Sequence, residues 1–139
     1  MDIRQLTPDL AVSSQIQPED LAGLAAEGYR VLINNRPDEE VGTDIDSDAM
    51  RAAAEAAGLS YYFNPFTPGQ ITPEMVALQA EALAQDGRKF AYCRSGNRST
   101  VLWALTQAGQ QPTDDLVDAA ARVGYDISGI RPLIESLAR

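Results

Sequence analysis

The sequence contains one cysteine, Cys93, in a segment that could hold an anion next to a nucleophile. Apolar residues 90–92 lead into Cys93, a polar turn follows, and an apolar periodic segment begins after Arg98. This order predicts a strand, a loop and a helix. Such a loop directs backbone N–H groups and the positive end of the helix dipole at one point, which favours a thiolate over a thiol. We therefore expect Cys93 to act as a nucleophile on an anionic substrate.

The other residues of this segment have expected roles in holding the anion. Arg98 opens the predicted helix and should point back over the loop, so it is the main candidate for binding the substrate. The rest of the anion-binding loop consists of Arg94, Ser95, Gly96 and Asn97. Arg36 and Phe66 are candidates from other segments. Arg36 could instead pair with Asp38 or Glu39, and Phe66 could form a pocket wall or pack on the surface.

A layered α/β fold is predicted to position this loop. Strands are expected over 9–13, 29–34, 59–64 and 89–92 because these runs are apolar and rich in β-branched or aromatic residues. Helices are expected between them and over 98–108, 113–123 and 128–138, with Thr72 as the N-cap of the one that starts at Pro73. The alternation predicts three layers, with a mostly parallel central sheet of about four strands flanked by helices. Arg36, the loop 65–70 and the cysteine loop should then meet at the carboxyl ends of the strands.

Length and composition place limits on the class of protein. The chain has 139 residues, 45% of them hydrophobic, so residues 1–139 are expected to form one domain. It shows no signal-like or membrane-spanning run, and the expectation is a soluble, cytoplasmic protein. The net charge of −9 opposes binding to nucleic acid or an anionic membrane. Positive charge is expected to concentrate around Cys93, because Arg88, Lys89, Arg94 and Arg98 lie nearby in the sequence.

The acidic segment 38–48 partly imitates a calcium-binding loop. Asp44, Asp46 and Asp48 have the required spacing, and Glu55 follows eleven positions after Asp44. Ala49, however, stands where the sharp turn of that motif needs glycine. The acids are better explained as the start of a helix, where they face the positive end of its dipole. We expect no metal site and no cofactor.

The residues also resemble a bacterial family. The segments Val12–Gln15, Val31–Glu40 and Cys93–Ser99, the last followed by Leu102–Leu105, resemble the phosphatase-like domain of the beta-lactamase hydrolase-like proteins, and the resemblance covers nearly the whole chain. It implies a protein tyrosine phosphatase-like, dual-specificity-like fold that carries a rhodanese-like loop. It also implies that the domain stands alone or is fused to a metallo-beta-lactamase-fold hydrolase, which is the expected functional partner.

Phosphoester hydrolysis is one chemistry that this resemblance implies. Cys93 and Arg98 match the phosphatase nucleophile and phosphate-binding arginine, and Ser99 matches the hydroxyl that assists departure of the thiolate. The spacing differs, because four residues separate the cysteine from the arginine where phosphatases have five, and Tyr92 replaces the usual histidine. The loop 65–71 contains no acid, so only a residue such as Asp38 could protonate the leaving group. Loss of a general acid typically costs about 10²–10⁴ in rate.

Sulfur transfer is the other chemistry, and the sequence favours it. Here the Cys93 thiolate takes a sulfane sulfur from thiosulfate or a persulfide, and the leaving group needs less protonation than an alkoxide does. The expected substrate is therefore a small anion, namely thiosulfate, a persulfide or, in the alternative function, a phosphoester. A noncatalytic anion-binding or redox-sensing module is the third hypothesis.

Overall fold

The computed structural model of the protein describes residues 1–67 and 69–139 and contains a five-stranded sheet in the order β1-β2-β5-β3-β4. The strands β2, β5, β3 and β4 are parallel, and β1 pairs antiparallel with β2. Their bounds are Ile3–Gln5 for β1, Leu10–Ser13 for β2, Tyr29–Asn34 for β3, Ser60–Phe63 for β4 and Arg88–Tyr92 for β5. The prediction of a mostly parallel sheet is confirmed.

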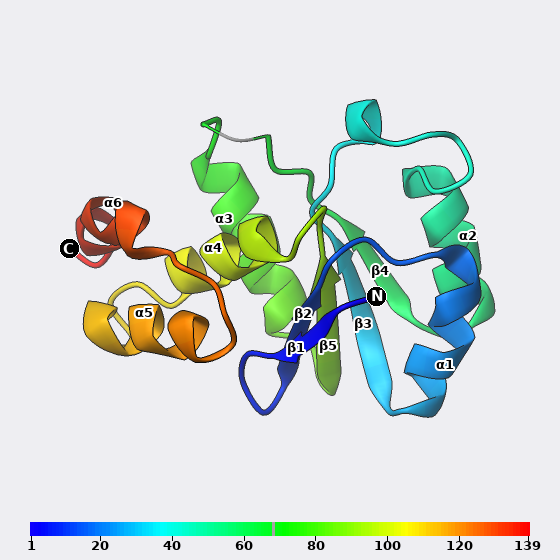
Figure 1. Ribbon diagram of the computed structural model, residues 1–139, viewed down its shortest axis with the longest axis horizontal. Helices are drawn as coiled ribbons and strands as arrows, with labels where there is room; N and C mark the ends of the chain where they lie inside the picture. The colour runs from blue at the N-terminus through cyan, green and yellow to red at the C-terminus, as the bar shows by residue number, and fades with distance from the viewer. Residues whose placement is uncertain (68) are drawn as a thin grey trace.

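Helices cover both faces of the sheet (Figure 1). On one face lie α1 and α2, and on the other α3 and α4, with α5 and α6 packed beyond them. Their bounds are Leu21–Ala26, Ser47–Ala56, Pro73–Leu83, Asn97–Thr106, Thr113–Arg122 and Arg131–Leu137 for α1 to α6, and three short 3-10 helices are η1 (Pro18–Asp20), η2 (Asp38–Glu40) and η3 (Ser128–Ile130). This is the three-layer α/β arrangement that the sequence predicts.

Each face of the sheet has its own buried core because strand side chains alternate between the two faces. In β3, Ile33 belongs to the cluster under α3 and α4, and Leu32 belongs to the cluster under α1 and α2. In β5, Ala91 and Phe90 divide between the faces in the same way. Neighbouring strands are therefore held in register from both sides, which fixes the positions of the loops that follow them.

The sequence prediction missed one strand. The three residues of β1 include none that is buried, so they form no apolar run that could be read as a strand. The edge position explains this, since an edge strand packs on one neighbour only. Elsewhere the helices and strands lie close to the expected positions, and the Thr72 hydroxyl accepts the hydrogen bond from the Met75 N–H that an N-cap should accept. Pro68 of the expected loop 65–70 lies outside the described residues.

The carboxyl ends of the four parallel strands lie at one edge of the sheet. Residues after β2, β3, β4 and β5 therefore approach one another there, and these are the segments 14–17, 35–37, 64–67 and 93–96. Within the part of the chain that the structure describes, no helix is both long and apolar enough to cross a membrane.

Candidate active site at the cysteine loop

Cys93 immediately follows β5, between the ends of β2 and β3. Its N–H donates to the Ser13 carbonyl at 3.3 Å, which continues the β2–β5 pairing, and its Sγ accepts a hydrogen bond from the Gly96 N–H at 3.1 Å. A sulfur with a backbone donor at the start of a helix has the environment in which cysteines act as nucleophiles. The residue is fully buried, with 0% exposure, so it lies beneath the loop. A substrate reaches the sulfur only if the loop or its covering side chains move.

The turn from Cys93 into α4 depends on a glycine. Gly96 is the N-cap of α4 and has φ +95, a conformation that L side chains rarely adopt. The hydroxyl of Tyr125, from the segment after α5, donates to the Ser95 carbonyl at 2.9 Å and lies where a Gly96 side chain would be. The Thr100 hydroxyl donates to the Gly96 carbonyl at 2.8 Å. The loop is therefore fixed by contacts from the segment after α5 and from α4 itself.

Arg98 forms a two-pronged ion pair with Glu40. Its Nη1 and Nη2 donate to the two carboxylate oxygens, each at 2.9 Å, and Nη1 also donates to the Phe66 carbonyl at 3.1 Å. A guanidinium has five N–H groups in a planar fork. Three of these N–H groups donate the hydrogen bonds given above. The other two, Nε–H and one N–H of Nη2, have no protein partner among the hydrogen bonds of residues 1–67 and 69–139. These two form the side-on fork, which can still bind an oxyanion.

A second arginine supports the same carboxylate. Arg36 donates from Nε to a Glu40 carboxylate oxygen at 3.3 Å, from Nη2 to the Glu40 carbonyl at 3.2 Å and from Nη1 to the Gln15 side chain at 3.1 Å. The sequence suggests Asp38 or Glu39 as the partner of Arg36, whereas the structure shows Glu40 as its partner. Arg36 and Arg98 thus share one acid, and the cluster has a net positive charge.

The charge state of Glu40 should make stability depend on pH. Hydrogen bonds from Arg98 and then from Arg36 hold the pKa of Glu40 below its usual value of 4.5, although burial opposes the shift. Because the folded-state pKa is the lower one, the stabilisation is complete above pH 4.5 and is lost as pH falls through the folded-state value. We expect the unfolding free energy of the wild type to fall more steeply below pH 4.5 than that of Glu40→Gln, by less than about 1 kcal/mol for this half-exposed pair. Urea titrations from pH 6 to about pH 3 measure this, and parallel curves would contradict it.

Ser99 belongs to a buried polar network. Its hydroxyl donates to Asn35 Oδ1 at 2.8 Å, and Gln79 Nε2 donates to the same oxygen at 3.2 Å. Gln79 Oε1 in turn accepts from the amides of Asn35 and Asn64, each at 2.9 Å. The network joins α4 to α3 and to the ends of β3 and β4. Because its proton is given to Asn35, Ser99 serves in this structure to position the start of α4.

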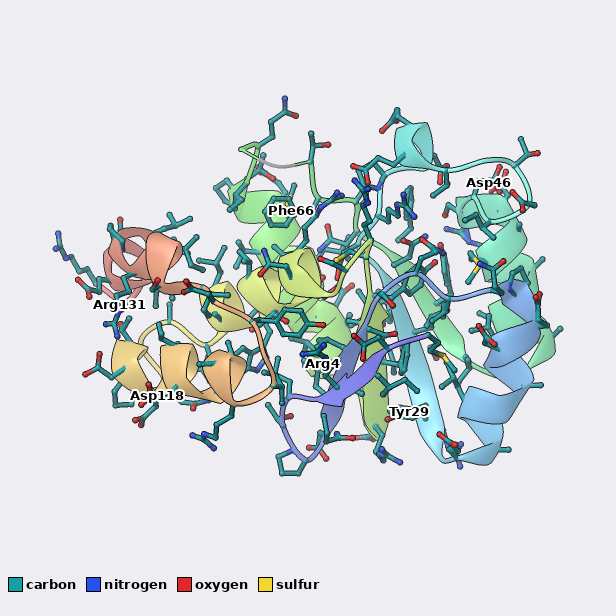
Figure 2. The ribbon with its side chains drawn as sticks, viewed as in Figure 1. Arg4, Tyr29, Asp46, Phe66, Asp118 and Arg131 are labelled. Carbon is teal, nitrogen blue, oxygen red and sulfur yellow. The ribbon has the colours of Figure 1, made fainter. Side chains whose placement is uncertain are left out.

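Asp38 and Phe66 are both held by the fold. Asp38 Oδ1 accepts from the Ser47 N–H at 2.8 Å, beside the start of α2. Phe66 has a buried side chain in the core between the sheet and α3 and α4, and its carbonyl accepts a hydrogen bond from Arg98. Figure 2 shows its ring above α4, near the carboxyl edge of the sheet. The pocket walls at this loop are supplied by its neighbours Pro65 and Thr67.

The remaining loop residues are exposed, and the positive charge is less concentrated than expected. Arg94, Ser95 and Asn97 are exposed. Asn97 is the first residue of α4, and no side chain caps the start of this helix. The cluster of four cations around Cys93 is not formed, because Arg88 and Lys89 begin β5 and so lie at the opposite edge of the sheet. Arg88 contacts Tyr29 there. Arg94 and Arg98 are the cations that remain beside the cysteine loop.

Sequence reasoning missed Glu40, Gln79 and Tyr125 as parts of the site. Glu40 lies 58 residues from Arg98, and Tyr125 lies 30 residues from Ser95. The sequence did contain one signal of a polar network, namely Asn34, Asn35 and Asn64. Side-chain amides at the ends of strands are often buried, and buried amides need hydrogen-bond partners. The sequence could not show which partners the fold supplies.

The fold and the loop define a class before any particular relative is considered: an α/β domain of the tyrosine phosphatase type with a cysteine–arginine loop. The family model "Beta-lactamase hydrolase-like protein, phosphatase-like domain" matches residues 2–110. The chain belongs to this family, which confirms the resemblance read from the sequence. It is 33% identical over 130 residues to the beta-lactamase hydrolase-like protein of Xylella fastidiosa (strain Temecula1), covering 91% of this chain and 30% of that protein. The chain therefore spans less than a third of this curated relative.

Solved structures confirm the fold. A protein of Neisseria meningitidis Z2491, described as a "putative phosphatase", superposes with a TM-score of 0.83 at 27% identity and covers 99% of both chains. The core catalytic domain of the PP-IP phosphatase Siw14 from S. cerevisiae superposes with a TM-score of 0.69 at 14% identity, covering 97% of this chain and 84% of that one. The second likeness concerns the fold alone. The family model and the Neisseria likeness support the alternative function, phosphoester hydrolysis, better than the sulfur transfer that the sequence favours.

Proposed function

We propose that the protein is an enzyme that hydrolyses phosphoesters through a covalent Cys93 intermediate. The observation that carries the proposal is a cysteine sulfur that accepts a backbone N–H at the carboxyl edge of a phosphatase-like sheet, followed at the start of α4 by Arg98, whose Nε–H and one Nη2 N–H have no partner among the described residues. Membership of a phosphatase-like family and the likeness to the Neisseria protein support it. The proposal also includes a metallo-beta-lactamase-fold hydrolase as functional partner, which the family resemblance implies; this chain covers 30% of the Xylella relative, so that protein has room for a further domain.

The chemistry follows from the positions of these groups. The Cys93 thiolate attacks phosphorus, a P–S bond forms and the P–O bond to the leaving group breaks, with its electron pair going to the departing oxygen. The Arg98 fork and the N–H groups of the loop bind the phosphoryl oxygens as their charge rises. Water then attacks phosphorus and the P–S bond breaks, which regenerates the thiolate and releases phosphate. Glu40 keeps the Arg98 guanidinium in the plane that this binding requires.

The structure limits which leaving groups can depart. The Asp38 carboxylate is bound by the Ser47 N–H, and Glu40 is held as an anion by two arginines. Tyr92 points into the core under α1 and α2, where burial raises the pKa of its hydroxyl well above the ordinary value. Asp38 and Glu40 are thus engaged by other groups, the Tyr92 hydroxyl points away from the loop, and the sequence contains no histidine. The proposed substrates are therefore phosphoesters whose leaving group is already a stable anion, such as aryl phosphates.

Sulfur transfer remains the second candidate because a specific observation favours it. Four residues separate Cys93 from Arg98, so the loop offers a smaller ring of N–H groups than a phosphatase loop with five. Sulfite or a thiolate leaves without a proton, which suits the same lack of a general acid. In that reaction the thiolate attacks the outer sulfur of thiosulfate, an S–S bond forms, and sulfite departs with the electrons of the broken bond.

One pair of assays separates these functions. The wild-type protein is incubated with an aryl phosphate while released phosphate is measured, and separately with thiosulfate before intact-mass spectrometry. Phosphate release with repeated turnover supports hydrolysis. An adduct of one sulfur atom on Cys93 without phosphate release would support sulfur transfer in place of hydrolysis. If neither phosphate release nor the adduct is observed, both functions are contradicted and the hypothesis of an anion-binding module is left.

A further inference from the structure

A cavity lies beside the Arg98–Glu40 pair and is not used by the chemistry above. Its volume is about 380 Å³, and its walls come from the η2 segment, the end of β4 and the start of α3. The residues that line it include Pro37, Asp38, Glu39, Phe63, Pro65 and Met75. The volume lies within the usual range of small-molecule sites.

The cavity adjoins the anion-binding arginine through two short chain connections. Asp38 and Glu39 directly precede Glu40, which binds the end of the Arg98 guanidinium. On the other side, Pro65 precedes Phe66, whose carbonyl accepts from Arg98 Nη1. The cavity therefore lies close to the partners of Arg98, and we take it as the recess for the organic part of a ligand whose anionic end binds this arginine.

The lining of the cavity combines two acidic residues and an apolar wall with the uncharged polar residues Thr67, Gln70 and Thr72. Asp38 uses one carboxylate oxygen for the Ser47 N–H, and Glu39 is exposed and forms no ion pair in the described part of the chain. No lysine or arginine is among the described residues that line it. The ring of Phe63 and the side chains of Pro37, Pro65 and Met75 supply apolar surface. Two negative charges on an apolar wall fit a positively charged organic group.

We propose that this cavity binds a cationic group, such as a quaternary or protonated amine, on the organic part of the substrate. The inference that the phosphoryl end binds at Cys93 depends on the proposed function, whereas the inference that the cationic end binds in the cavity depends on the cavity alone. The carboxylates of Asp38 and Glu39 attract the charge, and the apolar walls contact the carbon atoms around it. The substrate class is then a phosphoester whose leaving group carries a positive charge.

Two probes of the same shape test the charge preference. The affinities of para-(trimethylammonio)phenyl phosphate and para-tert-butylphenyl phosphate are measured by calorimetry on the Cys93→Ser protein, which cannot turn them over. The cationic ester should bind about five-fold more tightly, as expected for one or two partly exposed charge pairs. Equal affinities would overturn the proposal.

Matched variants locate the effect. Glu39→Gln should reduce the preference to about two-fold, while Asp118→Asn, which removes the same charge from α5, should leave it unchanged. Figure 2 shows Asp118 on α5, at the lower left of the view, well separated from Phe66, which lies above α4. An equal reduction in both variants would show that the net charge of −9, and not the cavity, causes the preference.

A final probe separates this inference from the proposed function. The phosphate-free cation, para-(trimethylammonio)phenol, should still shift the NMR signal of the Met75 methyl group. If neither aryl phosphate binds but this cation does, the cavity is supported and the phosphoryl site is contradicted. If the cation leaves Met75 unaffected, the cavity proposal is wrong even where aryl phosphates are hydrolysed.

Discussion

Replacing Cys93 with serine is expected to lower the rate of aryl phosphate hydrolysis by at least about 10³-fold, because removal of a covalent nucleophile is among the most damaging changes to such an enzyme. A serine hydroxyl can occupy the same buried space and accept the same Gly96 hydrogen bond. It lacks a nearby base that could activate it, since Asp38 and Glu40 are both engaged elsewhere. The fold should therefore persist while the chemistry is lost.

Single-turnover rates with an aryl phosphate measure this effect. Thermal unfolding of Cys93→Ser provides the structural check, and Ser60→Ala, an exposed serine-to-alanine change on β4, provides a control that should keep the full rate. A Cys93→Ser protein that retains a tenth of the wild-type rate would show that the sulfur is not the nucleophile. The buried position of Cys93 would then reflect only packing, which is the most common role of a lone buried cysteine.

The order of helices and strands could be predicted from the sequence because its signals are local. Thr72 and Pro73 mark the start of α3, and the run from Tyr29 to Asn34 is apolar enough to identify β3. The position of Cys93 between a strand and a helix follows from the same kind of pattern. Parallel strands then place the loops at one edge, so the approximate location of the site also follows from the sequence.

The partners within the site could not be predicted because they depend on where distant segments meet. Local spacing offers Asp38 or Glu39 as the partner of Arg36, whereas the turn of η2 brings Glu40 to both Arg36 and Arg98. The hydrogen bond from Ser99 to Asn35 spans 64 residues. In each case the chemistry of the residue was evident, and the geometry that gives it a role comes from the tertiary fold.

The distribution of positive charge was the other property that the sequence misjudged. Sequence proximity places Arg88 and Lys89 near Cys93, but the extended strand between them carries these residues to the opposite edge of the sheet. Cys93 itself is covered because β5 lies inside the sheet, with β2 and β3 on either side. The positive potential at the loop therefore comes from Arg98, Arg94 and the backbone N–H donors, and the carboxylate of Glu40 reduces it.

Changing Gly96 to alanine should have the largest effect on the fold of the loop. The conformation at φ +95 costs a non-glycine residue about 1 kcal/mol or more. The new methyl group would also overlap the Tyr125 hydroxyl and lie 2.9 Å from its Cζ atom, which adds about 1–3 kcal/mol of overpacking. We expect a loss of about 3 kcal/mol in the free energy of unfolding. Because the Gly96 N–H and the Arg98 fork would move together, activity should fall by more than about 10²-fold.

Gly58→Ala separates the two contributions to that loss. Gly58 follows α2 with φ +82, and nothing lies within 4 Å of the position of an added Cβ, so this variant carries the backbone cost without the overlap. Urea unfolding should show a loss of about 1 kcal/mol for Gly58→Ala with full activity. The difference between the two variants then measures the contact between Gly96 and Tyr125. If both variants lose the same stability, Tyr125 yields easily, and the turn is held by its backbone conformation and not by packing from the segment after α5.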